Sequence, residues 1–285
     1  MRFSALGDAP NVGFMEADLK GEYHGVKGLN ALYRRLVAKN FTAIADMHNI
    51  LRSSYLRMRF NLANYRVEHL NKHRSERRQL TASQNKKTMR QLPTSIFPPE
   101  GGNLRPLSDV IGEKKNFQQW IGIAPFAAHE GKILPPEKTE ELIKEISRRH
   151  PSCRIFLFGG GEKEHAVLNA WCERYNNCTN ASQALHSLKE EMVVMSHLDV
   201  MVSMDSGNMH LAAISGTRVI SVWGETHPYA GFLGWNQRPE DCIQADLPCR
   251  PCSIYGNKPC QRGDYACLTS IDPITIADKV DWILN

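Results

Sequence analysis

The sequence predicts an α/β protein whose domains are built on parallel, doubly wound sheets. Three observations support this prediction. Short apolar segments alternate with amphipathic segments in the second half of the chain, a fainter alternation runs through the first half, and a stretch rich in proline, glycine and charge separates the two. With 285 residues, 42% of them hydrophobic, the chain is long enough to bury one large core or two ordinary ones.

The second half carries the clearer pattern. Residues 120–124 form a short apolar run before Pro125, as expected for a buried strand, and Pro135 and Pro136 open an amphipathic segment at 137–149 that predicts a helix. The remaining expected elements are a strand at 154–158, helices at 162–175 and 187–197, a strand at 198–204, a short helix at 208–214 and a strand at 218–223. Repeated units of strand, helix and strand indicate right-handed crossovers in a parallel sheet.

The first half repeats this pattern more weakly. Helices are expected at 25–38 and 51–62, and strands at 41–45 and 64–70. Periodicity is lost from 92 to 116, which predicts a linker. We therefore divide the chain into an N-terminal domain, residues 1–107, and a C-terminal domain, residues 108–285.

The excess of positive charge is local. The formal net charge is +5, but residues 52–90 contain eleven Lys or Arg residues against Glu68 and Glu76. Such a run is either a solvated face or a surface that meets an anionic partner. Aromatic residues hardly interleave with these charges, which disfavours nucleic acid, so an anionic lipid or membrane leaflet is the better candidate.

The cysteines and the N-terminal residues indicate in which cellular compartment the protein is expected. No apolar stretch is long enough to cross a bilayer, and residues 1–8 lack the apolar core and cleavage site of a secretory signal, so we expect a cytoplasmic protein. Its eight cysteines should then be thiols or metal ligands rather than disulfides. Four of the cysteines in the cysteine-rich stretch 242–267 could bind a structural zinc ion, or they could be chemically unreactive thiols of a loop. They are Cys249, Cys252, Cys260 and Cys267.

The strongest local signal for chemistry is the segment 205–210, Asp-Ser-Gly-Asn-Met-His, where a strand ends and a helix begins. The free amides of such a helix start suit a pyrophosphate. The alternative is that Asp205 or Ser206 merely caps the helix while His210 packs beneath it. A second glycine turn, 159–161, follows another strand, and two such turns favour a nucleotide crevice. The turn is not a G-x-G-x-x-G fingerprint, which disfavours a nicotinamide dehydrogenase.

Several motifs together carry a family resemblance. They are residues 2–8, Asp46-Met47-His48 with Arg52, Ile123-Ala124-Pro125-Phe126 with Lys132, Gly159-Gly160-Gly161-Glu162, the segment 205–210 and Trp223-Gly224-Glu225-Thr226-His227-Pro228. In these motifs the chain resembles glycosyltransferase family 9, the heptosyltransferases that build the inner core of lipopolysaccharide. The most specific part is the Asp-Ser-Gly-x-x-His segment followed by a strand and Gly-x-Thr-x-Pro.

The resemblance implies the GT-B architecture, in which two Rossmann-like, doubly wound domains face a cleft. It also implies an inverting transfer that requires no metal and no further cofactor, with Asp8 as general base. It places acceptor contacts at Asp46, His48 and Arg52 in the N-terminal, acceptor-side domain. The donor-binding residues that it implies in the C-terminal, nucleotide-sugar-binding domain are Lys132, Gly160, Glu162, Asp205, Ser206, Gly207, Met209 and His210.

The chemistry of such a transfer requires a proton acceptor and groups that stabilise negative charge. An acceptor hydroxyl must lose a proton, for which a carboxylate is suited, while helix amides and a lysine stabilise the leaving nucleoside diphosphate. Asp8 could otherwise be a turn residue after Gly7, and Lys132 an ordinary loop lysine. Compared with the family pattern, segments are missing after Asp8 and near Ile96, and Ile133-Leu134 replaces an aromatic residue before the proline.

The resulting function hypothesis is an inverting glycosyltransferase, with ADP-heptose as donor and a lipopolysaccharide core or related glycolipid as acceptor. An anionic glycolipid acceptor would bring the protein to the cytoplasmic face of the inner membrane as a peripheral partner. Two alternatives stay open: a nucleotide-sugar epimerase or hydrolase of the same fold, and a basic module that binds anionic lipid or nucleic acid. Release of nucleoside diphosphate only when acceptor is present would separate them.

Overall fold

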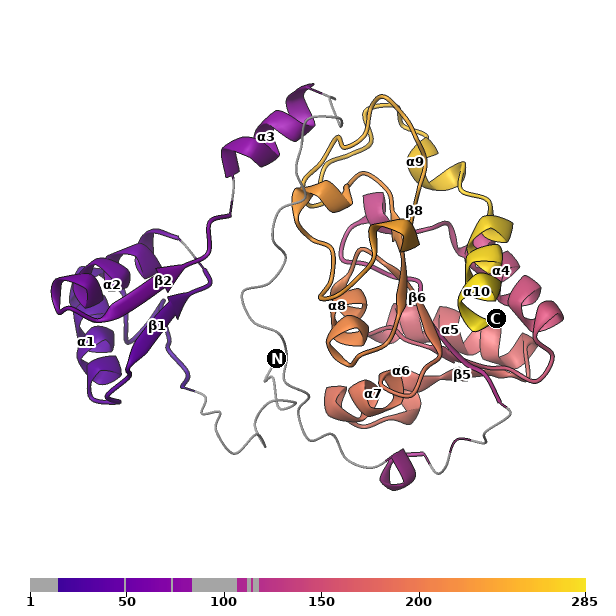
Figure 1. The fold of residues 1–285 in the computed structure, drawn as a ribbon, viewed down its shortest axis with the longest axis horizontal. Helices are drawn as coiled ribbons and strands as arrows, with labels where there is room; N and C mark the ends of the chain where they lie inside the picture. Colours follow the sequence, from indigo (N-terminus) through magenta and orange to yellow (C-terminus); the bar gives the residue numbers. More distant parts are fainter. Residues whose placement is uncertain (1–14, 49, 73, 84–106, 112–113, 115–117) are drawn as a thin grey trace. The chain divides into compact units, whose positions relative to one another are not determined.

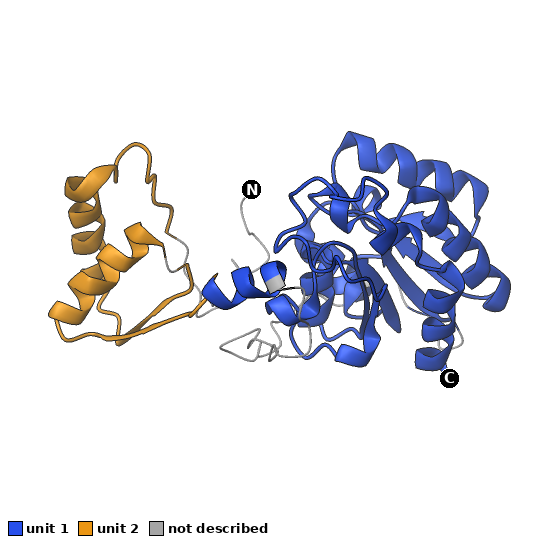
Figure 2. Cartoon of the chain, turned by 90° about the horizontal axis from the view of Figure 1, so that it is seen from above, with its two compact units in different colours: residues 1–9, 75–285 blue, residues 10–74 orange. Residues whose placement is uncertain are grey.

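The computed structural model describes residues 15–48, 50–72, 74–83, 107–111, 114 and 118–285. The chain divides into two compact units (Figure 2). Among the described residues, one unit contains those from 15 to 74 and the other contains those from 75 to 285. We call them the N-terminal and C-terminal units and describe each by itself.

The N-terminal unit is built on one parallel strand pair. Its elements are α1 (Gly25–Val37), β1 (Ala43–Asp46), α2 (Leu51–Leu62) and β2 (Arg66–His69), and Ala43 pairs with Arg66 in the parallel register. Phe60 of α2 is buried, and its ring lies 4.8 Å from that of Tyr33 in α1. The two helices and two strands expected from the weaker periodicity of the first half are thus confirmed.

The C-terminal unit contains a six-stranded sheet in the order β5-β4-β3-β6-β7-β8, and every neighbouring pair is parallel. The strands are β3 (Trp120–Ala124), β4 (Arg154–Leu157), β5 (Cys178–Asn180), β6 (Val200–Met204), β7 (Val219–Trp223) and β8 (Cys242–Gln244). All residues of β3, β6 and β7 are buried, as expected for strands covered on both faces.

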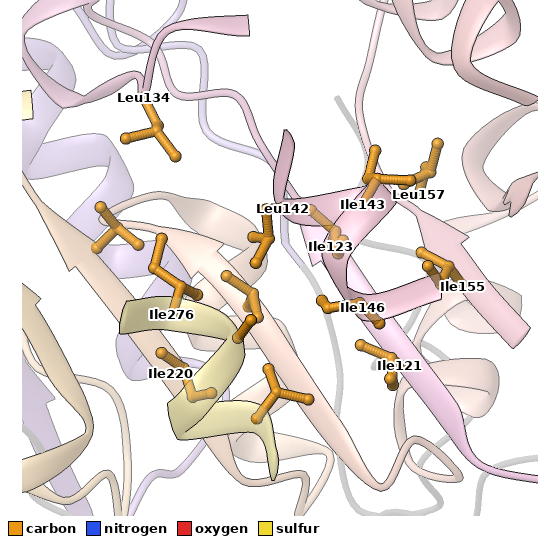
Figure 3. Packing of buried hydrophobic residues seen from close by; sticks show 14 of the residues in the cluster. Ile121, Ile123, Leu134, Leu142, Ile143, Ile146, Ile155, Leu157, Ile220 and Ile276 are labelled. Atoms are coloured by element: carbon orange, nitrogen blue, oxygen red, sulfur yellow. The ribbon is translucent and has the colours of Figure 1, made fainter. Parts of the chain in front are cut away.

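Helices cover the two faces of this sheet (Figure 1). One face carries α4 (Pro136–Arg149), α5 (Glu162–Arg174) and α10 (Pro273–Leu284), and the other carries α6 (Ala181–Ala184), α7 (Leu188–Met195) and α8 (Gly207–Ile214). Because side chains alternate along a strand, Ile121 and Ile123 pack on the first face, while Trp120 and Ala124 pack on the second. Figure 3 shows the first cluster, in which Ile123 lies among Leu142, Ile143 and Ile146 of α4.

Two further helices, α3 (Arg74–Ser83) and α9 (Ala266–Thr269), lie outside the two layers that cover the sheet. Helix α3 reaches the segment after β7, because Arg77 Nε donates to the Ala230 carbonyl at 2.9 Å. Helix α9 ends the cysteine-rich stretch. Most of the linker expected at 92–116 lies outside the described residues, so the domain division at residue 107 stays a prediction. In the described part, no helix is both long and apolar enough to cross a membrane.

Candidate functional site

Three strand ends form the candidate site. The sheet order reverses between β3 and β6, since β4 and β5 follow on one side and β7 and β8 on the other. At such a reversal the loops that leave the carboxyl ends of the strands diverge, and a crevice opens between them. Here the loops begin after Ala124, Met204 and Trp223, the last residues of β3, β6 and β7.

An ion pair joins two of these loops. Lys132, in the short helix η4 (Glu130–Lys132) after β3, places Nζ 2.9 Å from Oδ2 of Asp205, which follows β6 directly. The third loop contributes Thr226, whose Oγ1 donates to the same Asp205 oxygen at 2.8 Å. Thr226 is fully buried and the Asp205 side chain is nearly so. The site therefore presents a partly exposed lysine held by an inward-facing carboxylate.

The start of α8 lies beside this pair. Ser206 is the N-cap residue in an extended conformation, but its side chain makes no capping hydrogen bond within the described chain, and Asp205 is bound to Lys132 and Thr226. The capping alternative therefore does not describe this helix start. Its first amides are not covered by a side-chain cap, and a helix start of this kind favours anions. Gly207 would meet no atom within 4 Å with a side chain added, so the approach is open.

His210 stands at the edge of the same site. Its side chain stays exposed, but the protein atoms around its ring lower its pKa below 6.5 by desolvation; Asp205 opposes this shift and Lys132 adds to it. This shift favours the neutral imidazole, which can donate from only one ring nitrogen. The side chain of Met209 points elsewhere, because it is fully buried in the core beneath α8.

The glycine turn after β4 lies one strand away from β3, at the same edge of the sheet. Gly160 N donates to Glu164 Oε2 at 2.7 Å, and Gly161 adopts a φ of +83°, a conformation that favours glycine. Glu162 is exposed at the first position of α5. The structure thus brings the second predicted turn to the same edge, with Gly160 and Glu162 both at the surface.

The family model of glycosyltransferase family 9 (heptosyltransferase) matches residues 75–260. The chain belongs to glycosyltransferase family 9. It is 22% identical to lipooligosaccharide heptosyltransferase 2 of Campylobacter jejuni over 60% of this chain and 53% of that protein. It is 31% identical to lipopolysaccharide heptosyltransferase 1 of Campylobacter coli over 43% of this chain and 35% of that protein. The chain thus spans about half, or less, of the curated relatives that it matches.

Solved structures show that this family 9 chain shares their fold. The family 9 glycosyl transferase of Veillonella parvula matches with a TM-score of 0.63 and 17% identity, over 99% of this chain and 85% of that one. The ADP-heptose lipopolysaccharide heptosyltransferase II of E. coli matches with a TM-score of 0.57 and 19% identity, over 91% of this chain and 81% of that one. The predicted family and the predicted GT-B fold class, α/β with parallel sheets, are confirmed.

The predicted acceptor residues of the family 9 chain lie in the N-terminal unit. Asp46 ends β1 and is buried, and it accepts from Arg57 Nη1 at 3.3 Å and from the His48 amide at 3.0 Å. His48 and Arg52 are exposed just beyond it, Arg52 in the first turn of α2. The strand end therefore gathers these three residues locally. Asp8, the predicted base, lies outside the described residues.

Sequence reasoning missed Thr226 as a site residue. The motif that contains it is recognisable, but the motif alone assigns it no role, because its bond to Asp205 joins the ends of two different strands. Sequence reasoning also missed Glu225, whose amide donates to the Gly131 carbonyl at 2.8 Å beside Lys132. Burial raises the pKa of the Glu225 carboxyl above 4.5, Glu130 adds to the rise and Lys258 opposes it.

The four late cysteines border one small cavity of about 10 Å³, together with Arg250 and Arg262. All four are free, and burial raises the pKa of Cys252 to about 11 and that of Cys267 to about 12, so these two thiols keep their protons at neutral pH. Among the described residues no three His, Cys, Asp or Glu side chains form a ready metal site. A zinc site at Cys249, Cys252, Cys260 and Cys267 stays a prediction.

Proposed function

We propose that this family 9 chain is an inverting glycosyltransferase that moves heptose from ADP-heptose to a lipopolysaccharide core or a related glycolipid. The observation that carries the proposal is the Lys132 and Asp205 pair, 2.9 Å apart, beside the open start of α8 at the reversal of the sheet. A different E. coli heptosyltransferase of similar fold, WaaC, was solved with ADP and with ADP-2-deoxy-2-fluoro heptose, which supports the choice of donor.

Each group would have a distinct task. The ammonium of Lys132 and the amides at Ser206 and Gly207 would meet the two phosphates, where negative charge grows as the donor bond breaks. Asp205 would accept a hydrogen bond from a sugar hydroxyl, and it already orients Lys132. His210 would donate to a phosphate oxygen from its neutral ring. Glu162 and Gly160 would lie toward the nucleoside.

The transfer itself balances without a metal. The acceptor hydroxyl oxygen forms a bond to the anomeric carbon while its proton passes to the Asp8 carboxylate. The bond between the anomeric carbon and the phosphate oxygen breaks, and ADP leaves with the electron pair. Attack opposite to the leaving group inverts the anomeric configuration. Asp46, His48 and Arg52 would hold the acceptor, and the basic segment 52–90 would meet its anionic groups at the cytoplasmic face of the inner membrane.

The test is ADP release with and without acceptor. We expect ADP-heptose to be turned over only when a glycolipid acceptor is present, and ADP to raise the melting temperature through binding to the native state. ADP release without acceptor would favour a hydrolase or epimerase. If the protein neither binds ADP nor releases it, the basic binding module is favoured.

A further inference from the structure

The cysteine-rich loop, residues 245–265 between β8 and α9, lies directly against the lysine of the donor site. Gly256 is buried and has a φ of +69°. A β-carbon at position 256 would lie 2.6 Å from Cγ of Lys132, 3.1 Å from its Cε and 3.2 Å from its Cδ. The backbone of the loop therefore touches the aliphatic stem of Lys132 along three carbons, and only glycine allows this approach.

The loop is held in place next to this contact. The Gly256 amide donates to Oγ of Ser253 at 2.9 Å, and Ser253 is itself buried. The Cys252 amide donates to the Glu225 carbonyl at 3.2 Å. Glu225 in turn donates its amide to the Gly131 carbonyl, directly before Lys132. The turn that carries Gly256 is thus fixed to the two loops that frame the lysine.

The same loop also reaches the carboxylate partner. Arg250 is buried, and its guanidinium donates to the carbonyl oxygens of Trp223 at 3.0 Å and of Thr226 at 2.9 Å. Thr226 then donates its hydroxyl to Asp205. Arg250 therefore fixes the backbone of the residue that orients the carboxylate. The loop holds both members of the ion pair, Lys132 through Gly256 and Asp205 through Arg250 and Thr226.

We propose that the cysteine-rich loop is the positioning element of the donor-phosphate lysine, with Gly256 setting the stem of Lys132 and Arg250 setting the turn behind Asp205. This inference rests on the proposed function. A lysine ammonium on a free four-carbon stem loses rotamer freedom when it binds a phosphate. A stem already confined by Gly256 loses less of it, so nucleoside diphosphate binds more tightly.

The chain offers a matched pair of variants for the test. Gly256 and Gly263 lie in the same loop and both have positive φ, +69° and +78°, but nothing lies within 4 Å of a β-carbon at position 263. Gly256→Ala and Gly263→Ala therefore carry similar backbone strain. We expect Gly256→Ala to weaken ADP binding about tenfold in titration calorimetry, and Gly263→Ala to leave it within about twofold.

A double-mutant cycle separates positioning from general damage to the loop. In a Lys132→Ala background, Gly256→Ala should leave the remaining ADP affinity within about twofold, because its target is gone. Where Gly256→Ala does not fold, Ser253→Ala takes its place; it removes the acceptor of the Gly256 amide, and we expect ADP affinity to fall about threefold.

Each outcome decides something. Equal losses of ADP affinity in Gly256→Ala and Gly263→Ala, or a Gly256→Ala effect that persists in full without Lys132, would overturn the positioning role while leaving the donor site intact. A wild-type protein that binds ADP in neither calorimetry nor thermal shift would overturn the proposed function, and the positioning role with it.

Discussion

Oδ2 of Asp205 accepts two donors at once, Nζ of Lys132 and Oγ1 of Thr226. A hydrogen bond to a charged carboxylate is shorter and stronger than a neutral one, and a second donor fixes the plane of the carboxyl group. The two donors come from residues 132 and 226, far apart in the sequence. The ion pair between Lys132 and Asp205 thus depends on a third side chain that has no direct task in the proposed transfer.

Substitution of Thr226 tests the importance of its hydrogen bond to Asp205 directly. Thr226→Val keeps the shape of the buried side chain but removes the donor, so we expect kcat/KM to fall about tenfold, the cost of one hydrogen bond to a charged group. Thr226→Ser keeps the donor and should stay within about threefold of the wild type. Steady-state kinetics on both variants is the measurement. Equal losses in the two would mean that packing of the methyl group matters rather than the hydrogen bond.

The buried carboxyl group of Glu225 should make the protein less stable as pH rises, which is the reverse of the effect of a carboxylate that is paired in the folded state. It is fully buried, and neither carboxyl oxygen has a hydrogen-bond partner among the described residues. Burial raises its pKa in the folded state, whereas the unfolded chain ionises near 4.5. Above that pH the folded state binds more protons than the unfolded state, so the contribution of Glu225 to stability falls as pH rises through the folded pKa.

The corresponding variant is Glu225→Gln, which removes the ionisation. We expect it to be more stable than the wild type at pH 8 by about 1 kcal/mol, and the difference to vanish toward pH 4.5. Thermal melts across this range measure it. The control is Glu173→Gln, an exposed glutamate on α5, which should show no such trend. A difference that is constant with pH would mean that Glu225 is paired when charged.

At the scale of elements, the apolar runs predicted β3 at its observed bounds, and β6 and β7 within two residues. Strands covered on both faces need apolar side chains throughout, so they stand out in the sequence. The three-residue strands β5 and β8 were not predicted, because Cys178–Asn180 and Cys242–Gln244 are short and of mixed polarity. Their pairing is decided by the neighbouring strands, which local sequence does not encode.

A chelator should affect the proposed anion site and the cysteine-rich loop differently. Because the proposed anion site consists of amides and Lys132, we expect sugar transfer to survive EDTA in the first minutes. If the four late cysteines hold zinc, activity should then decline slowly as the loop loses its metal, and zinc should restore it. A timed assay with and without added metals measures both phases. Immediate loss that magnesium reverses would contradict the metal-free mechanism.

At the scale of the whole molecule, motifs in the amino-acid sequence indicate the proposed donor site, but the sequence does not reveal the contacts within it. The segment 205–210 stands out by its residue types at a strand end, and Lys132 stands out only through the family resemblance. The roles of Thr226, Arg250 and Gly256 could not be predicted, because each depends on a contact between loops that only the folded sheet brings together. A motif reveals which residue types stand at a strand end, whereas the role of a positioning residue depends on tertiary contacts that the motif does not contain.

The proposed transfer requires both halves of the molecule, and Asp8 is the residue that tests this requirement. Asp8→Asn keeps size and most hydrogen bonding but removes the proton acceptor. We expect donor affinity to change little and kcat to fall by about 10²- to 10⁴-fold, the usual contribution of a positioned general base. Lys132→Ala should behave differently, weakening donor binding as well as slowing transfer, because the proposed contact between Lys132 and phosphate would already form in the ground state.

Binding of ADP and turnover are measured separately for the two variants, so the two roles can be told apart. An Asp8→Asn protein that folds, binds donor and still transfers sugar at nearly the wild-type rate would show that Asp8 is only a turn residue after Gly7. The base would then have to lie elsewhere on the acceptor side. Asp46 and His48, gathered at the end of β1 by a hydrogen bond of 3.0 Å, are the next candidates for the same substitution test.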